Sequence, residues 1–267
     1  MSSALWLLWR PSDVLAANHV AMNAASVDGN PDAEVRALKE LGTAYMHLQE
    51  LDRTMICYQE ALGICRVTGN RRQEILVLDF LGYACRELGQ FDQAISCHQE
   101  ALRIIRETED RASEDNVLNN LGLDYQELGQ FDQAISSHQE ALEICRRTGD
   151  RFSEGYNLGN LGHVYQELKQ FDQAISCHRQ QLEISRETGE RHAEIGALLS
   201  LGNAYQELRQ LDKATVLLEE AATALRISGD PEMTRWLDGL MNRQRKLGRP
   251  WFLRKLSRPA RLSMPPQ

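Results

Sequence analysis

The chain has 267 residues, ample for one elongated domain with a continuous core, and a formal net charge of −8. This charge argues against nucleic acid as the main partner, because binding to phosphates needs a basic surface. The charge is unevenly distributed: residues 235–267 carry nine arginines and lysines and one aspartate, a net +8, so the other 234 residues carry −16. An acidic body is therefore joined to a basic C-terminal segment.

Residues 1–30 predict part of a repeat. Residues 11–28 align with the second helix of the later units, and Pro11 suits the first turn of such a helix. The segment is therefore either an N-terminal cap or the remainder of a unit in a longer protein. The apolar run Ala4–Trp9 is too short to cross a bilayer and lacks the flanks of a signal peptide, so we expect a cytoplasmic protein with no membrane partner.

Residues 31–230 consist of five units of 40 residues. The dipeptide Leu-Gly recurs at a constant step of 40, at Leu41, Leu81, Leu121, Leu161 and Leu201. The seven residues that begin at Gln130 are also identical to those that begin at Gln90 and Gln170. Self-similarity at this period is typical of stacked helical repeats, in which each unit buries its apolar face against its neighbours.

The third unit predicts a hairpin of two helices. Its first half places five apolar residues on one helical face: Val117, Leu118, Leu121, Tyr125 and Leu128. Its second half forms another stripe: Phe131, Ala134, Ile135, His138, Ala141, Leu142 and Cys145. Gly129 lies between the two halves and can adopt the left-handed conformation that ends a helix, while Asp132 suits the start of the second helix.

The joints between units predict a helix stop followed by a helix start. Thr148-Gly149-Asp150 is matched by Thr68-Gly69-Asn70, Thr188-Gly189-Glu190 and Ser228-Gly229-Asp230. The second unit instead has Glu109 at the glycine position. There we expect either about 1 kcal/mol of strain or a locally different turn.

The glycine after each repeated leucine lies inside the first helix, where it costs about 1 kcal/mol relative to alanine. A cost that recurs in all five units needs a reason. We expect the glycine to permit close approach of the second helix, with alanines such as Ala134 and Ala141 facing it.

After the last unit, Pro231 predicts the start of a capping helix over 231–248, which covers the fifth unit with Trp236, Leu237, Leu240 and Met241. Residues 249–267 follow, and their four prolines oppose a stable helix. This basic segment includes the run from Trp251 to Leu256. It is a disordered, solvated tail, or it docks on an acidic surface such as the chain's own groove, or it contacts a membrane surface.

The sequence has no nucleotide-binding, zinc-protease or serine-hydrolase motif, which favours a non-enzymatic protein. His98, His138 and His178 recur at the repeat step, but equivalent residues of stacked helices lie about 8–10 Å apart and zinc ligands lie at about 2 Å. We therefore predict that these histidines are packing residues and that the chain binds no metal and no cofactor. The cysteines form no C-x-x-C pair and are typical of reduced packing residues: Cys57, Cys65, Cys85, Cys97, Cys145 and Cys177.

The units resemble the tetratricopeptide repeat. In the third unit, residues stand where that family places its large residue, its Leu-Gly pair, its tyrosine and its two alanines: Leu118, Leu121, Gly122, Tyr125, Ala134 and Ala141. The 40-residue length is similar to the long subclass found in Leu-Gly-Asn adaptors, kinesin light chains and the repeat tails of bacterial signalling ATPases. The resemblance covers roughly residues 36–229, with Cys85 at a tyrosine position as one departure. It implies an all-α, right-handed superhelix of hairpins whose first helices line a concave groove.

The resemblance also points to a partner-binding surface on the first helices, beside each Leu-Gly pair. These positions vary between units while the scaffold does not, as a specific binding surface would, although an ordinary solvated face is the alternative. We further predict that Asn119, Asn120 and Asn160 bind the backbone of an extended peptide, since an amide both donates and accepts. The predicted binding residues are Arg36, Lys39, Thr43, Asp79, Tyr83, Arg86, Asn116, Asn119, Asn120, Leu123, Tyr156, Asn160, His163, Asn203 and Gln206.

The predicted function is an adaptor, scaffold or regulatory module that binds a protein or peptide segment in the groove. Its mixed chemistry, with Lys39 and Asp79 beside asparagines, argues against an all-basic site for carboxylates. One alternative is the sensor region of a larger signalling ATPase or transcription regulator, which the half-unit at the start favours. Another is a quorum-type peptide receptor, although that class carries an additional N-terminal bundle. Dimerisation through the end units is left open.

Overall fold

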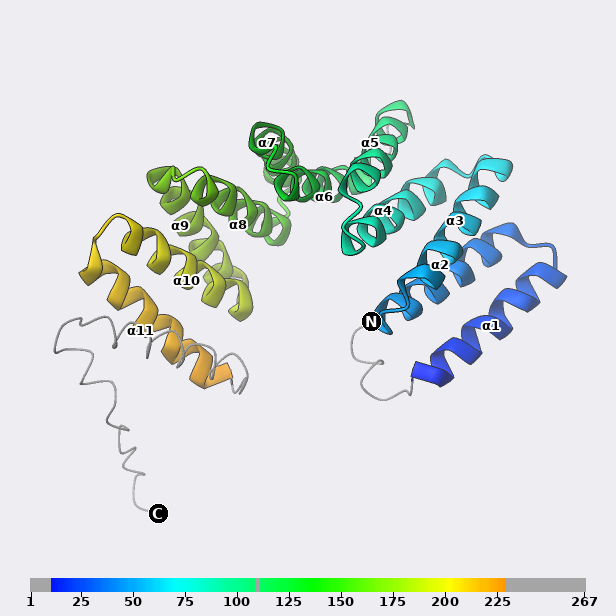
Figure 1. Cartoon of the computed structure of the whole chain (residues 1–267), viewed down its shortest axis with the longest axis horizontal. Helices are drawn as coiled ribbons and strands as arrows, with labels where there is room; N and C mark the ends of the chain where they lie inside the picture. Colours follow the sequence, from blue (N-terminus) through cyan, green and yellow to red (C-terminus); the bar gives the residue numbers. More distant parts are fainter. Residues whose placement is uncertain (1–10, 109–110, 229–267) are drawn as a thin grey trace, which may run out of the picture.

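The computed structural model describes residues 11–108 and 111–228, in which eleven α-helices, one 3₁₀ turn and no β-strand are found (Figure 1). The all-α prediction is confirmed. Glu109, residues 1–10, the helix predicted over 231–248 and the basic segment 249–267 lie outside this part. The helices are α1 (Pro11–Val27), α2 (Pro31–His47), α3 (Leu51–Thr68), α4 (Arg71–Glu87), α5 (Phe91–Thr108), α6 (Glu114–Glu127), α7 (Phe131–Thr148), α8 (Arg151–Glu167), α9 (Phe171–Thr188), α10 (Arg191–Glu207) and α11 (Leu211–Ser228).

Each 40-residue unit folds into one hairpin, from α2–α3 to α10–α11, and α1 packs on α2 as the second helix of an incomplete unit. Each second helix also packs on the first helix of the next hairpin. The first helices of successive hairpins contact one another, whereas the second helices of the described chain have no comparable contact. The stack is therefore curved into an arch with the first helices on its inner side (Figure 1).

A shared core runs through neighbouring hairpins. One continuous cluster of buried side chains extends from Val35 on α2 to Ile144 on α7 and includes Leu78 and Leu118. Complete burial of a side chain of this size contributes roughly 1.5–3 kcal/mol. Because the cluster crosses the boundaries between units, no hairpin buries its apolar stripe by itself.

The turn inside each hairpin requires one residue in the left-handed region. Gly129 has φ +69° and its N–H donates to the carbonyl of Gln126 (2.9 Å), which confirms its predicted role. Gln49, Lys169 and Arg209 adopt the same conformation in other hairpins, with φ of +61°, +58° and +60°. A non-glycine residue there costs about 1 kcal/mol, so the surrounding packing imposes the turn.

The described residues that follow Glu109 differ from those of the regular joints, whereas Glu109 itself lies outside the described part, so the prediction made for it stays a prediction. The next helix is preceded by a 3₁₀ turn over Arg111–Ser113, and α6 has 14 residues where the other first helices have 17. In the regular joints a left-handed glycine such as Gly149 (φ +77°) is followed by a capping residue. The carboxylate of Asp150, for example, accepts from the N–H of Ser153 (3.0 Å).

The glycine of each Leu-Gly pair makes room for a large side chain of the second helix, which the prediction did not name. A Cβ atom on Gly122 would lie 2.6 Å from the ring of His138, and one on Gly202 would lie 2.8 Å from Leu218. Tyr58, His98 and His178 occupy the same place over Gly42, Gly82 and Gly162. Ala134 and Ala141 are fully buried, and at the position of Ala134 in the first unit the Thr54 hydroxyl donates to the Gly42 carbonyl (3.3 Å). The close approach is therefore a large side chain against backbone, and His98, His138 and His178 are fully buried against these glycines.

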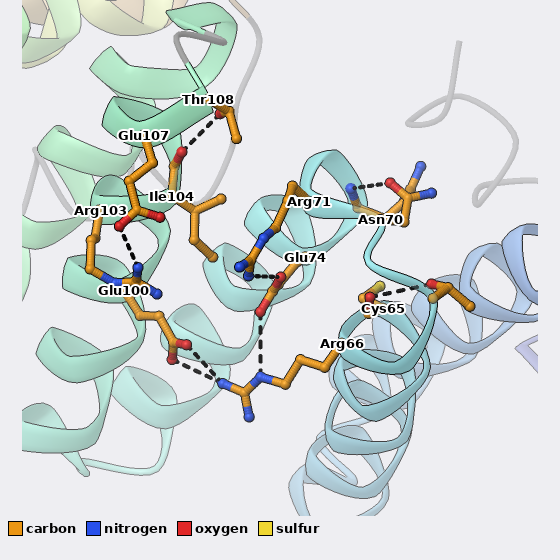
Figure 2. Close-up of polar contacts among 12 residues, drawn as sticks. Cys65, Arg66, Asn70, Arg71, Glu74, Glu100, Arg103, Ile104, Glu107 and Thr108 are labelled. Atoms are coloured by element: carbon orange, nitrogen blue, oxygen red, sulfur yellow. Dashed lines mark hydrogen bonds and ion pairs between the residues drawn. The ribbon is translucent and has the colours of Figure 1, made fainter.

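A ladder of polar side chains links consecutive hairpins at the joints, where each second helix ends and the next first helix begins. Glu74, at the first turn of α4, is buried and accepts from Arg66 of α3 (3.4 Å) and Arg71 of α4 (2.8 Å). Figure 2 shows Arg66 reaching on to Glu100 of α5, at 2.9 Å. The arrangement recurs as Arg106–Glu114–Glu140, Arg146–Glu154–Gln180 and Arg186–Glu194–Glu220. Each arginine therefore connects three helices of two units.

Within residues 11–108 and 111–228, no helix combines the length and the apolar character needed to cross a membrane.

The glycine-to-ring contact predicts opposite effects for two similar substitutions. Gly122→Ala should lower the free energy of unfolding by about 1–3 kcal/mol, because the methyl group overlaps the His138 ring. Gly196→Ala, in α10, should raise it by about 0.5–1 kcal/mol, since nothing lies within 4 Å of the new methyl group. Urea unfolding of both variants tests this pair, and stabilisation by Gly122→Ala would contradict the packing described.

The buried histidines predict a loss of stability in mild acid. Burial lowers the pKa of His138 and of His178 to about 4, whereas an unfolded histidine titrates at about 6.5. Between these values the unfolded state binds more protons. The free energy of unfolding therefore decreases as the pH is lowered, by up to about 3 kcal/mol per histidine. The double variant His138→Phe/His178→Phe should lose less stability between pH 7 and pH 4.5 than the parent in urea titrations. An equal loss would show that these rings do not titrate as described.

Candidate binding surface

The inner face of the arch is formed by α2, α4, α6, α8 and α10 (Figure 1). The predicted binding residues all lie on these five helices. Arg36, Asn116, Tyr156, His163 and Asn203 are exposed, while Leu123 and Gln206 are half-buried. The structure therefore distributes the predicted side chains along the whole arch.

Four of the predicted residues line one hollow of about 490 Å³ on this face: Thr43, Asp79, Tyr83 and Asn120. The rest of its wall comes from Met46, His47, Gln49, Leu51, Tyr58, Phe80 and Glu87. The hollow thus lies between α2, α4 and α6, with α3 at its base. This concentration on the first three hairpins did not follow from the sequence.

Two aromatic rings give the hollow an apolar, partly exposed wall. Phe80 is 36% exposed and Tyr83 is 39% exposed, and Tyr58 stacks on Phe80 with 5.6 Å between ring centroids. Burial raises the pKa of Tyr58 to about 12, with its hydroxyl 3.2 Å from the Thr43 hydroxyl. Sequence reasoning missed Phe80, although it lies one repeat step before Asn120. Comparison of equivalent positions would have found it.

The two basic side chains beside the hollow are engaged by the protein itself. Lys39 donates to Gln73 of the next hairpin (2.9 Å), and its burial lowers the pKa of the ammonium group. Arg86 lies 5.1 Å from the centre of the Tyr83 ring and donates to Asp124 (3.0 Å). These cations therefore support neighbouring side chains, which leaves Asp79 and Glu87 as the charged groups in the wall.

A buried polar network lies behind the hollow. Asp124 of α6 is fully buried and is hydrogen-bonded to Arg86 of α4 and, at 2.5 Å, to Nδ1 of His98 of α5. The other ring nitrogen of His98 lies 3.6 Å from Asp79, whose carboxylate accepts from Asn120 at 2.8 Å. The network joins the second hairpin to the third and fixes the orientation of the side chains that reach the surface.

The asparagines predicted to bind a peptide backbone bond instead to the protein. Asn119 is only 8% exposed, and its carbonyl accepts from Asn160 of the next hairpin at 2.8 Å. Asn120 donates to Asp79, and its carbonyls lie 3.3 and 3.4 Å from Arg86. Asn119 therefore offers little surface to a peptide, because side chains 41 positions apart face each other across the stacked first helices, and binding of a peptide by these asparagines stays a prediction.

Burial also raises the pKa of most of the cysteine thiols. It raises the pKa of Cys65 and Cys177 to about 11 and of Cys145 to about 12, and it raises that of Cys57. Cys85 is the exception, since a hydrogen bond with Cys97 lowers its pKa. All six are free thiols, five of them buried, as expected for packing residues. In the described part of the chain, no group of histidine, cysteine and acidic side chains could hold a metal ion.

The profile of the tetratricopeptide repeat family matches residues 34–107, 74–147, 113–162 and 153–227. The structure of BtubC from P. vanneervenii is similar over 83% of this chain and 93% of its own, with 19% identity and a TM-score of 0.76. A Signal Transduction ATPase with Numerous Domains with a tetratricopeptide repeat sensor, from Pyrococcus horikoshii, is similar over 92% of this chain and 43% of its own, with 18% identity and a TM-score of 0.64.

A Rap protein in complex with Competence and Sporulation Factor is similar over 85% of this chain and 73% of its own, with 15% identity and a TM-score of 0.56. At these identities the likeness concerns the fold. No curated protein sequence gives a significant match.

The network behind the hollow predicts a large effect of one substitution. Arg86→Met should lower the free energy of unfolding by about 3 kcal/mol, because it leaves the Asp124 carboxylate buried without its guanidinium partner. Gln126→Met, at the equivalent position of the next hairpin, is the control, since the Oε1 atom of Gln126 has no partner among the described residues. Adding Asp124→Ala to Arg86→Met should recover part of the loss. Equal urea midpoints for the two single variants would contradict this role.

Proposed function

Because the chain belongs to the tetratricopeptide repeat family, we propose that its inner face holds an extended segment of a partner protein or peptide. The chain then acts as a non-enzymatic adaptor or regulatory module. The hollow between α2, α4 and α6 carries this proposal, because exposed aromatic rings and predicted binding residues meet there in one concave place.

The wall of the hollow suits an apolar anchor flanked by positive charge. Phe80 and Tyr83 offer flat, partly exposed rings of the kind that contribute most to protein interfaces. Asp79 and Glu87 supply carboxylates at its edge, and the side chains that line it include no lysine or arginine. This composition supports a segment with an apolar side chain and a nearby cation, and it disfavours a free C-terminal carboxylate as the recognised group.

The rest of the inner face extends the proposed surface. Tyr156 on α8 is 55% exposed and near enough to Tyr83 to contribute to the raised pKa of that phenol, after burial and Glu87. Both tyrosines lie on first helices of the inner face, in different hairpins. His163 and Asn203 continue the exposed strip toward α10.

Substitution of Tyr83 tests this function. A library of displayed peptides is selected on the full chain, and the Kd of each selected peptide is measured by fluorescence anisotropy. Tyr83→Ala should raise Kd at least about tenfold, equivalent to about 1.4 kcal/mol of binding free energy. The control is Ile56→Ala, which removes a 62% exposed apolar side chain from a position of α3 that does not line the hollow.

The control should change Kd less than about twofold, and thermal melts of both variants should show that they remain folded. Selected peptides that bind Tyr83→Ala with unchanged affinity, or a library from which no peptide binds, would rule out the hollow as the recognition site.

A further inference from the structure

The last residue of each first helix from α4 to α10 is a glutamate on the same edge of the inner face. These residues, Glu87, Glu127, Glu167 and Glu207, are all exposed, and Glu87 lines the hollow. We call them the glutamate row. Within residues 11–108 and 111–228 none of them forms an ion pair, whereas the glutamates of the ladder are all paired with arginines.

The position of the row increases its negative potential. Each glutamate lies at the C-terminal end of a helix, where the unpaired carbonyl groups and the helix dipole are also negative. The nearest cation of the groove, Arg86, is bound to Asp124, so it does not neutralise Glu87. Lys169 and Arg209 follow Glu167 and Glu207 by two residues and offset part of their charge, so the acidic edge is strongest at Glu87 and Glu127. There it lies beside an apolar hollow, which makes it the complement of a basic, apolar segment.

The packing distance expected between helices gives the row a spacing that an extended chain can follow. Packed helices lie about 8–10 Å apart, and successive first helices contact each other directly. An extended or polyproline chain advances about 3.1–3.4 Å per residue, so every third residue meets the next glutamate. The complementary segment should thus carry a cation at every third position and should contain proline.

The basic C-terminal segment of this chain has that pattern. Lys255, Arg258 and Arg261 are three residues apart, and the same step includes Arg249 and continues back to Lys246 and Arg243. Phe252 is the single interruption. Pro250 and Pro259 disfavour a helix and favour the polyproline conformation in which third residues face the same side.

We propose that residues 249–261 lie along the glutamate row of the same molecule, with their cations on successive glutamates. Exposed ion pairs are individually weak, so a free basic peptide would bind poorly. The segment follows the last hairpin in the chain, however, and such a tether gives an effective concentration of about millimolar. A partner that enters the hollow must then displace the segment from Glu87 and its neighbours. Binding of the row by the chain's own C-terminal segment goes beyond the proposed function. Either proposal can fail without the other.

Zero-length carbodiimide cross-linking of the full chain at low salt tests the contact directly. Mass spectrometry should find Lys255 joined to Glu127, Glu167 or Glu207, and these links should fall at least about fivefold in 0.5 M salt, where exposed charges are screened within about 4 Å. Neutralising the neighbouring cations with Arg258→Gln/Arg261→Gln, which keeps Lys255, should lower the same links. Equal linkage of Lys255 to Glu143 and Glu183, on the second helices, would overturn the proposal, as would no linkage.

Mixing of unlabelled and ¹⁵N-labelled chains shows whether the segment on the row comes from the same molecule or from a second copy. Links confined to a single isotope support the contact in cis, whereas mixed links show that a second copy supplies the segment and overturn it.

Limited trypsin digestion gives an independent measurement. Cleavage after Lys255 should be at least about threefold faster in Glu127→Gln/Glu167→Gln/Glu207→Gln than in the parent, because the segment is released. The matched control, Glu60→Gln/Glu143→Gln/Glu183→Gln, removes the same charge from exposed positions of second helices and should cleave at the parental rate. Identical rates in the two triple variants would overturn the proposal.

Discussion

A buried glutamate at the first turn of α4, α6 and α8 fixes how each hairpin sits on the one before it. Glu74, Glu114 and Glu154 accept from an arginine of the preceding unit, and that arginine continues to the following second helix. Removing both arginine partners of such a glutamate would leave a buried charge uncompensated, which is far more costly than the loss of an exposed pair. The apolar cores could slide over one another by small amounts, but these fork-shaped contacts cannot. The curvature of the inner face, and with it the hollow, depends on that fixed placement.

The fold could be predicted almost completely because the information is local and repeated. The step of 40 residues, the apolar stripes and the glycine turns each specify a helix or its end without reference to distant parts of the chain. The explanation for the glycine after each leucine was incomplete, because it did not include the large side chain that packs on the glycine in three dimensions. The sequence contains both alanines and a large residue in the second helix, and only the observed rotation of that helix shows that the large residue faces Gly122.

The candidate site could be predicted only as a set of helix positions. Thr43, Asp79, Tyr83 and Asn120 do line the hollow, since they occupy the expected face. Which polar groups remain accessible depends on partners in other units: Asn160 reaches Asn119, and Arg86 reaches Asp124. Those pairings are set by the stagger between stacked helices, a quantity that periodicity along one helix does not contain. The Arg–Glu ladder, in contrast, was visible as charges that recur at the repeat step and was overlooked.

Near-identical units raise the problem of assembling in the wrong order during folding, a hazard of repeat proteins. The carboxylate of Asp124 makes the contact between the second and third hairpins different from the other contacts between hairpins. If the third hairpin docked on the first, Asp124 would face Met46 and Tyr58, which stand at the positions of Arg86 and His98. A charge would then be enclosed without a cation, a state several kcal/mol less stable. One aspartate, at a position that holds alanine in three other units, can therefore determine the order in which these similar hairpins stack.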